Sequence, residues 1–350
     1  MANFSQQILK WFDAHGRHNL PWKDPVIPKP MRAYHIWLSE VMLQQTQVTT
    51  VIPYYQRFVA AFPSLQKLAQ ASQDEVLSLW SGLGYYARGR NLHKAAQQMW
   101  SEHKTVPNDF ETLLALPGIG RSTAGAIMAQ AYNAPYAILD GNVKRVLARY
   151  YAVQGWYGVS AVGKQLWQYS ETLAPKKRVA DYTQAIMDLG ATLCTRSKPK
   201  CTACPIAKQC VAFQTDRVAE FPHKKPKKQK PVKQVYVLCL VDDGSVLLQQ
   251  RPPTGIWGGL WSFPEFEDVT SLHAHIQDQV SQEDIQELES FRHTFSHYHL
   301  DIHPHVVMSS DKMAPANVMD AQSRFFNLHQ QPEVGIAAPV KRIMQSLLSL

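Results

Sequence analysis

Hydrophobic residues recur at spacings of three and four through most of the first part of the chain. This spacing is typical of amphipathic helices. In the opening segment, Phe4, Ile8, Trp11 and Phe12 fall on one helix face. Further helices are predicted over residues 36–47, 52–62, 73–80, 90–101, 110–116, 122–132 and 143–151. The pattern therefore predicts an all-helical domain over residues 1–221.

The pattern changes after residue 233, where β-branched runs replace the helical spacing. Val235–Val241 is predicted to be a buried strand, and Asp243-Gly244 is a strong signal for a β-hairpin turn. Residues 222–233 contain three prolines and six lysines without an acid, which is typical of an extended linker. We therefore expect a basic linker over 222–233 and a mixed α/β domain over 234–350.

The composition indicates a folded protein with a polyanionic partner. Hydrophobic residues make up 45% of the chain, which excludes wholesale disorder. No run reaches the ~18 apolar residues of a membrane-spanning helix, and the first helix lacks the apolar core of a secretory signal. A cytoplasmic location is expected. The net charge of +8 favours a partner such as nucleic acid, although the lysines of the linker fit a solvated tether equally well.

Four cysteines close together in the sequence indicate a metal centre. Their spacing is C-x6-C-x2-C-x5-C, formed by Cys194, Cys201, Cys204 and Cys210. Zinc usually takes two Cys-x-x-Cys pairs and only one is present, so a [4Fe-4S] cluster is favoured over zinc. Disulfides are not expected in a reducing compartment. Cys239 lies alone in an apolar run and is predicted to be a core residue.

Two short segments are candidates for contacts with phosphates. The loop between the first two cysteines carries Arg196, Lys198 and Lys200. The LPGIG segment joins two helices within residues 110–132, and Gly118 and Gly120 would leave backbone N–H groups open at a helix N-terminus. A solvated loop and an ordinary turn remain the alternatives for these segments.

Two carboxyl groups differ in their predicted surroundings. Glu40 shares a helix face with Ile36, Trp37 and Leu43, so burial should raise its pKa and favour a proton-holding acid. Asp140 lies at the predicted N-cap of the helix over 143–151, where backbone N–H groups should keep it ionised. Cleavage of a glycosidic bond through an oxocarbenium-like state needs this division of roles. A surface glutamate and a purely structural cap are the alternatives.

Five motifs resemble, in this order, those of the helix-hairpin-helix DNA glycosylase superfamily. They are SEVMLQQTQV, GLGYYARGRNL, LPGIGRSTAGAI, LDGNVKRV and the four-cysteine spacing. Within the superfamily, nearly the whole chain is most similar to the MutY family of adenine DNA glycosylases. The related endonuclease III has a catalytic lysine where this chain has Ser122, and a serine cannot form a Schiff base. The resemblance therefore implies a monofunctional hydrolase, with Lys144 giving at most a slow adventitious adduct.

The resemblance implies a monomer that removes adenine opposite 8-oxoguanine or guanine in duplex DNA after flipping the base out. It implies that Glu40 protonates adenine, that Asp140 stabilises the sugar cation, and that Asn142 helps to position water and sugar. Expected contacts with DNA or the lesion are Gln45, Thr46, Leu83, Tyr85, Gly118, Gly120, Ser122, Lys144, Arg196, Lys198, Phe295, Ser296 and His297.

Residues 234–350 resemble a Nudix (MutT-like) domain that has lost its catalytic acids. Gly259–Glu265 fits the opening G-x5-E, but later acidic positions fall on His273-Ala274 and Gln277-Asp278. Pyrophosphate hydrolysis is therefore not expected. The resemblance implies a lesion-binding module, with FRHTFSH at residues 291–297 reading 8-oxoguanine.

Alternating histidines in the C-terminal domain could suggest a second metal site. They are His297, His299, Asp301, His303 and His305. Pro304 is expected to interrupt the strand, so exposed histidines are the favoured interpretation.

Two other functions remain open from the sequence. An iron-sulfur DNA-binding sensor without catalysis would leave Glu40 and Asp140 without a purpose. A Nudix hydrolase with a DNA-binding extension would need the missing acids.

Overall fold

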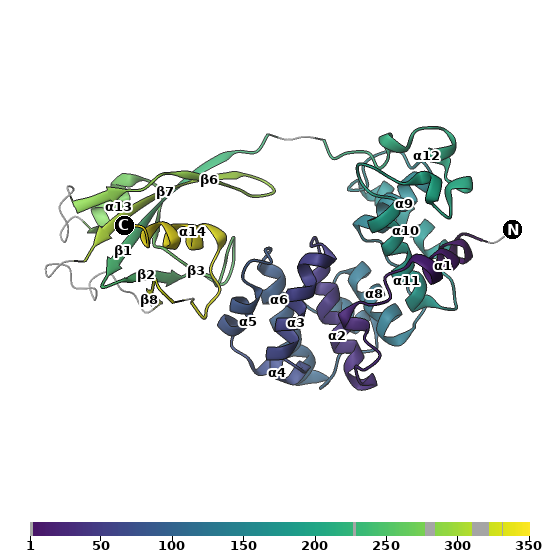
Figure 1. Ribbon diagram of the computed structural model, residues 1–350, viewed down its shortest axis with the longest axis horizontal. Coiled ribbons are helices and arrows are strands. Elements are labelled where there is room, and N and C mark those ends of the chain that lie inside the picture. Colours follow the sequence, from purple (N-terminus) through teal and green to yellow (C-terminus); the bar gives the residue numbers. More distant parts are fainter. Residues whose placement is uncertain (1–2, 227–228, 277–283, 310–321, 331) are drawn as a thin grey trace. The chain divides into compact units, whose positions relative to one another are not determined.

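The computed structural model describes residues 3–226, 229–276, 284–309, 322–330 and 332–350. Two of the six linker lysines, Lys227 and Lys228, and the pair Gln277-Asp278 lie outside these ranges. The chain forms two compact units, of which the first comprises residues 1–70 and 94–227 and the second comprises 71–93 and 228–350 (Figure 1). The second unit therefore combines a helical segment with the C-terminal part of the chain.

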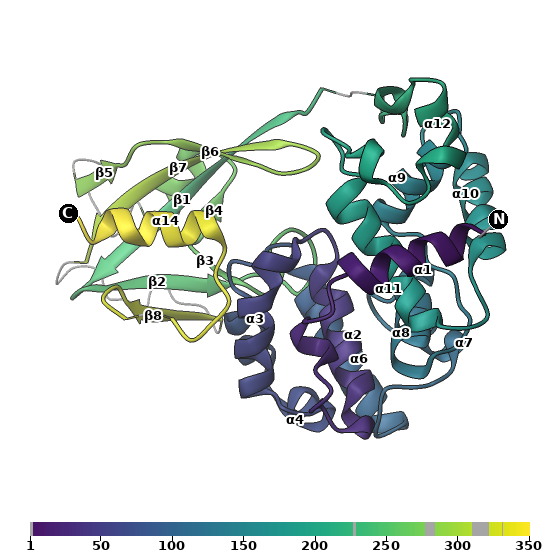
Figure 2. The same ribbon diagram turned by 45° about the vertical axis from the view of Figure 1, so that its right-hand side comes forward.

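The first unit is helical (Figure 2). Its helices are α1 (Phe4–His15), α2 (Lys29–Leu43), α3 (Val48–Ala61), α4 (Leu65–Gln70), α7 (Phe110–Ala115), α8 (Arg121–Tyr132), α9 (Gly141–Tyr150), α10 (Ser160–Leu173), α11 (Val179–Asp188) and α12 (Val211–Gln214). Helix α6 (Ala87–Glu102) begins in the second unit and ends in the first. Among the described residues, every helix is too short or too polar to span a bilayer.

The predicted helices are present, and the structure of the first unit adds α4, α10, α11 and α12. Helix α11 buries polar as well as apolar side chains, including Thr183, Gln184 and Asp188. Polar and apolar side chains of this helix are therefore buried together. Polar caps mark other helix starts, since Asn3 and Ser72 form capping boxes for α1 and α5 (Gln73–Trp80).

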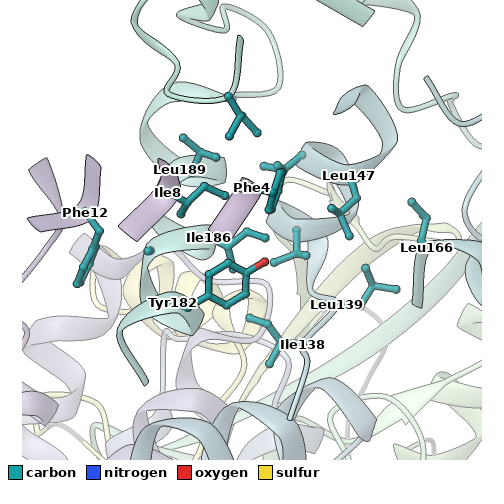
Figure 3. Packing of buried hydrophobic residues seen from close by; sticks show 14 of the residues in the cluster. Phe4, Ile8, Phe12, Ile138, Leu139, Leu147, Leu166, Tyr182, Ile186 and Leu189 are labelled. Atoms are coloured by element: carbon teal, nitrogen blue, oxygen red, sulfur yellow. The ribbon is translucent and has the colours of Figure 1, made fainter. Parts of the chain in front are cut away.

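A hydrophobic core joins α1 to α9, α10 and α11 (Figure 3). Phe4, Ile8 and Phe12 contribute from α1, as the sequence predicts. Leu147 of α9 and Ile186 of α11 belong to the same cluster, and full burial of each such side chain stabilises the fold by about 1.5–3 kcal/mol. This core holds α9 against α11 and thereby fixes the start of α9.

The second unit contains α5 and one mixed sheet. The strands are β1 (Val232–Asp242), β2 (Ser245–Gln250), β3 (Trp261–Ser262), β4 (Glu265–Phe266), β5 (Ile285–Glu287), β6 (Phe291–Thr294), β7 (His299–Met308) and β8 (Ser323–Asn327). The main path is β3-β2-β1-β7-β5, with β4 on β1, β6 on β7 and β8 on β2. Strands β1 and β7 are parallel, with Tyr236 opposite His303.

The predicted hairpin and core cysteine are both confirmed. Asp243 and Gly244 have φ of 40° and 67° and connect β1 to β2, which is the geometry of a type I′ turn. Cys239 is fully buried in β1. Helix α13 (Val269–Ile276) packs on β1 and β4, and α14 (Ala338–Leu347) runs alongside the sheet (Figure 2).

Pro304 does not interrupt its strand, contrary to the sequence prediction. Strand β7 continues through it because β6 pairs with residues 299–302 and β5 with residues 305–307. Pro304 falls between these two short partners, where its missing N–H removes no ladder bond on that side.

Candidate active site

An open cavity of about 900 Å³ lies in the first unit. Its wall is formed by the end of α2, the loop over residues 44–49, the starts of α8 and α9, and the turn after α11. Glu40, Asp140 and Asn142 all line it. Side chains that are far apart in the sequence therefore share one site. The volume is within the range of ligand pockets, about 300–1,000 Å³.

Glu40 projects from α2 into a largely desolvated position. Burial raises the pKa of its carboxyl to about 7, as the sequence predicts in direction. A hydrogen bond from Gln130 and the charge of Lys23 oppose this rise, and the charge of Asp140 adds to it. The Gln130 Nε2 donates to Glu40 Oε1 at 2.5 Å. A group with this pKa can hold a proton near neutrality and release it within the same pH range.

Asp140 is the N-cap of α9, as predicted. Its Oδ1 accepts from the Val143 N–H at 2.7 Å, and its Oδ2 accepts from the Asn142 Nδ2 at 3.2 Å. The sequence predicts that such bonds keep Asp140 ionised; the structure adds burial, which raises the pKa of Asp140 above its usual value. The hydrogen bonds and the charge of Arg145 act in the opposite direction. The pKa values of Glu40 and Asp140 are therefore both raised, because both carboxyls lose hydration in the same cavity.

Arg145 connects the start of α9 to the cysteine-containing loop. Its Nη2 donates to Asn142 Oδ1 at 2.8 Å and to the Gly190 carbonyl at 2.6 Å, and its Nε donates to the Cys194 carbonyl at 2.6 Å. A glycine at position 190 lets the turn after α11 lie close to Asn142, because a Cβ there would lie 2.6 Å from the Cβ of Asn142. Neither Arg145 nor Gln130 is among the site residues predicted from the sequence. A lone amide in the apolar stretch 124–131 is the signal that could have revealed Gln130.

Ser122 and Lys144 differ in their relation to the cavity. Ser122 lines the cavity and its Oγ accepts from the Leu139 N–H at 3.0 Å. Lys144 is not part of the cavity wall, and its Nζ lies 5.3 Å from the centre of the Tyr157 ring. The amine is therefore directed to an aromatic face outside the cavity.

The hairpin between α7 and α8 has the predicted tight turn. Gly118 has φ of +77°, and its carbonyl accepts from Gln44 Nε2 at 3.2 Å. Gly120 caps α8, and a Cβ there would meet nothing within 4 Å. The N-terminus of α8 is therefore open for a ligand to approach.

The other residues predicted to contact DNA in this unit divide into two groups. Gln45, Thr46 and Arg196 line the cavity, and Gln45 has φ of 60°. Lys198 is exposed, and its carbonyl accepts from the Thr195 hydroxyl at 2.8 Å.

The four cysteines of the spacing motif line one small cavity. Its other walls are mainly aliphatic and aromatic, with Arg149 and Lys200 as the cations. Arg149 is only 3% exposed and donates to Cys194 Sγ at 3.3 Å and to the Thr195 carbonyl at 2.8 Å. No three His, Cys, Asp or Glu side chains in the described residues are arranged to hold one metal ion. The four sulfurs are instead distributed around a cavity.

Comparisons with known proteins give the family. Residues 38–172 match the HhH-GPD superfamily of base excision DNA repair proteins, and residues 235–346 match the NUDIX domain. The adenine DNA glycosylase of Buchnera aphidicola subsp. Acyrthosiphon pisum is 36% identical over 98% of this chain and 97% of its own. The human adenine DNA glycosylase is 32% identical over 98% of this chain and 73% of its own. The chain belongs to the adenine DNA glycosylases.

Solved structures are similar to this chain in fold over part of its length. A thermostable thymine-DNA glycosylase is similar over 61% of this chain and 95% of its own, with 27% identity and a TM-score of 0.53. An endonuclease III in a non-covalent DNA complex shares the fold over 61% of this chain and 94% of its own, with 20% identity and a TM-score of 0.51. The predicted resemblance is confirmed, and this adenine DNA glycosylase hydrolyses an N-glycosyl bond.

The second unit of the glycosylase carries two further predicted segments. Tyr85 is 53% exposed with φ of 49°, whereas Leu83 is only 6% exposed. Arg88 lies against Tyr85, with its guanidinium 5.6 Å from the ring centre. Tyr85 is thus presented to solvent, and Leu83 is packed inside.

The segment that joins β6 to β7 carries Phe295, Ser296 and His297. Ser296 and His297 are exposed, and the Phe295 N–H donates to the Tyr298 carbonyl at 2.9 Å. The Phe295 ring lies 5.0 Å from that of Trp257, centre to centre. Trp257 has φ of 55°, an uncommon backbone conformation for a bulky residue. An aromatic platform therefore lies beneath the exposed loop.

Among the described positions of the Nudix-like domain, Glu265 and His305 both contact neighbouring side chains. Glu265 is ion-paired with Arg251. His305 is buried, at 3% exposure, so the interpretation of exposed strand histidines is wrong for this residue. Its ring lies 5.9 Å from that of Tyr236, centre to centre, in a tilted arrangement, and burial lowers its pKa.

Proposed function

We propose that this glycosylase excises adenine paired with 8-oxoguanine or guanine in duplex DNA and leaves an abasic site. The observation that carries the proposal is the convergence of Glu40 and Asp140 on one cavity, with the pKa of Glu40 raised to about 7. A buried acid that titrates near neutrality suits protonation of a purine leaving group.

In the proposed reaction, adenine is flipped from the duplex into the cavity. Glu40 donates its proton to the adenine ring as the C1′–N9 bond breaks, and the bonding electrons leave with the base. The Asp140 carboxylate stabilises the positive charge that develops on the sugar. Water then supplies hydroxide to C1′, and its proton returns to a carboxylate. Asn142 orients Asp140 and the sugar.

Ser122 makes the proposed reaction hydrolytic. A lyase step needs an amine that attacks C1′, and the serine hydroxyl cannot form the Schiff base. Lys144 lies over Tyr157 and outside the cavity wall, which argues against its use as the nucleophile.

Cys194, Cys201, Cys204 and Cys210 would hold a [4Fe-4S] cluster in this proposal. One thiolate binds each iron of such a cluster, so four sulfurs around a cavity suit it better than a zinc ion, whose ligands converge within about 2.3 Å. When bound, the cluster supplies a structural crosslink for the loop over residues 195–200. Arg196 and Lys198 of that loop, with Gly118 and Gly120 of the hairpin, then contact DNA phosphates.

The C-terminal domain reads the lesion in this proposal. Phe295, Ser296 and His297 contact 8-oxoguanine, the exposed Tyr85 enters the base stack beside it, and Gln45 and Thr46 face the lesion strand. The catalytic domain extends to residue 221, the linker covers 222–233, and the lesion-recognition domain covers 234–350. The enzyme acts as a monomer in the cytoplasm, at the nucleoid.

The test uses duplexes that hold adenine opposite 8-oxoguanine, guanine or thymine. Adenine should be released from the first two, with strand breaks appearing only after alkali. The Glu40→Gln variant should bind the same duplexes and release roughly 10²–10⁴-fold less adenine per unit time. Equal release from all three duplexes, or wild-type release by Glu40→Gln, would contradict the proposal.

A further inference from the structure

Glu40 has one direct amide neighbour that the reaction described above does not use. Gln130 lies on α8, which packs against α2, and its Nε2 donates to Glu40 Oε1 at 2.5 Å. The other amide atom, Gln130 Oε1, is buried and accepts no hydrogen bond from the described residues. A buried amide with one unsatisfied atom is destabilising, so its placement here needs a reason beyond packing.

The contact with Glu40 distinguishes the two carboxyl oxygens. An amide N–H donates to a carboxylate oxygen and also to the carbonyl oxygen of a protonated carboxyl. Glu40 Oε1 can therefore keep this bond in both protonation states. If the proton sat on Oε1, that oxygen would become the donor atom of the carboxyl, and the Gln130 N–H would face an O–H group. The amide thus favours protonation at Oε2.

Several charged groups surround this pair. Lys23 in the turn over residues 21–23 and the Asp140 cap of α9 both act on Glu40. Arg17, Arg145 and Arg196 contribute further cations to the cavity wall. Among the effects that lower the pKa of Glu40, the hydrogen bond from Gln130 is the largest. Removing this hydrogen bond should raise the pKa of Glu40 further, because less then counteracts the effect of burial.

We propose that Gln130 is a positioning residue for adenine excision: its amide anchors Oε1 of Glu40, so that the catalytic proton is carried on Oε2 and presented to the base. This inference rests on the proposed function of Glu40 as the acid. Gln130 itself does not touch the adenine. It fixes the direction of the acid and the pH range over which the acid is protonated.

The test compares two substitutions of similar size in the full-length enzyme. Gln130→Met removes the donor, and Gln130→Glu replaces it with a second carboxyl that shares protons with Glu40. Single-turnover adenine release from the A:8-oxoguanine duplex is measured from acidic to alkaline pH. Both variants should move the alkaline limb of the rate profile to higher pH, and Gln130→Met should lower the maximal rate roughly tenfold through loss of orientation.

Gln184→Met provides the matched control. Gln184 is a buried amide in the same cavity wall, but its Nε2 donates to Asp188 Oδ1 at 2.7 Å and not to Glu40. Its variant should keep the alkaline limb of the wild-type enzyme. The amplitude of the first turnover counts active molecules, so incomplete folding of any variant does not alter the comparison of rate profiles.

The outcomes separate this inference from the function on which it rests. If the wild-type enzyme releases no adenine from the A:8-oxoguanine duplex, the proposed function is wrong. If the wild-type enzyme is active but Gln130→Met and Gln130→Glu both retain its alkaline limb, the role assigned to Gln130 alone is wrong. A limb that moves equally in Gln184→Met would also overturn it.

Discussion

Arg145 donates a hydrogen bond to Asn142 across one turn of α9, and the same guanidinium also holds the Cys194 carbonyl. Asn142, which follows the Asp140 cap, and Cys194, the first cysteine of the spacing motif, are therefore joined through one side chain. We therefore expect a change in the cysteine-containing loop to affect the cavity through this contact.

Replacing Arg145 with methionine should weaken both ends of this connection. Each hydrogen bond from a charged donor contributes about 1.5–3 kcal/mol, so we expect the free energy of unfolding to fall by at least about 2 kcal/mol. The rate of adenine release should fall as well, because Asn142 loses its anchor. Denaturant unfolding and single-turnover kinetics measure the two effects. Wild-type kinetics in a destabilised variant would show that the contact serves stability alone.

The pH dependence of excision should follow the protonation of Glu40. Its pKa in the folded enzyme is about 7, above the usual value of 4.5, so the active protonated form is lost as pH rises through about 7. The same raised pKa means that Glu40 favours folding most below pH 4.5, and this contribution is lost as pH rises through 7. A rate profile that stays flat from pH 5 to 9 would contradict the assignment.

Cys204→Ser should remove one ligand of the proposed cluster. We expect loss of the iron and of the visible absorbance of the cluster, with weaker binding of any duplex, because the loop carrying Arg196 and Lys198 is no longer crosslinked. The loss of DNA binding should be smaller at low salt, for matched and mismatched duplexes alike. Cys239→Ser is the control, since Cys239 is buried in β1 and should leave the iron content unchanged. Equal iron content in Cys204→Ser would contradict the ligand set.

Trp257→Ala should reduce the preference for 8-oxoguanine. The Trp257 ring supports both Phe295 and His293, at centre-to-centre distances of 5.0 and 5.4 Å. Without this platform the loop over residues 295–297 loses its fixed conformation, and we expect the ratio of release rates for A:8-oxoguanine over A:G to fall roughly tenfold. Trp257→Phe should restore most of the ratio. The idea fails if the ratio is unchanged while Trp257→Ala remains folded.

The sequence predicted those local features that are set by the residues of one short segment alone. The Asp243-Gly244 turn follows from residues that tolerate positive φ, and the N-cap at Asp140 follows from a carboxylate before a helical pattern. Pro304 shows the limit of such reasoning. Its tolerance in β7 depends on where two other strands end, which no local pattern contains.

For the active site, the sequence by itself supplied the candidate residues: the motif order, the glutamate at position 40, the capped aspartate and the serine in place of a lysine. Only the tertiary structure decided their environment. Packing of α2 against α8 brings Gln130 to Glu40, and burial raises the pKa of both Glu40 and Asp140 where the sequence predicted opposite behaviour. Desolvation depends on every element that closes around a group, so a linear pattern cannot supply it.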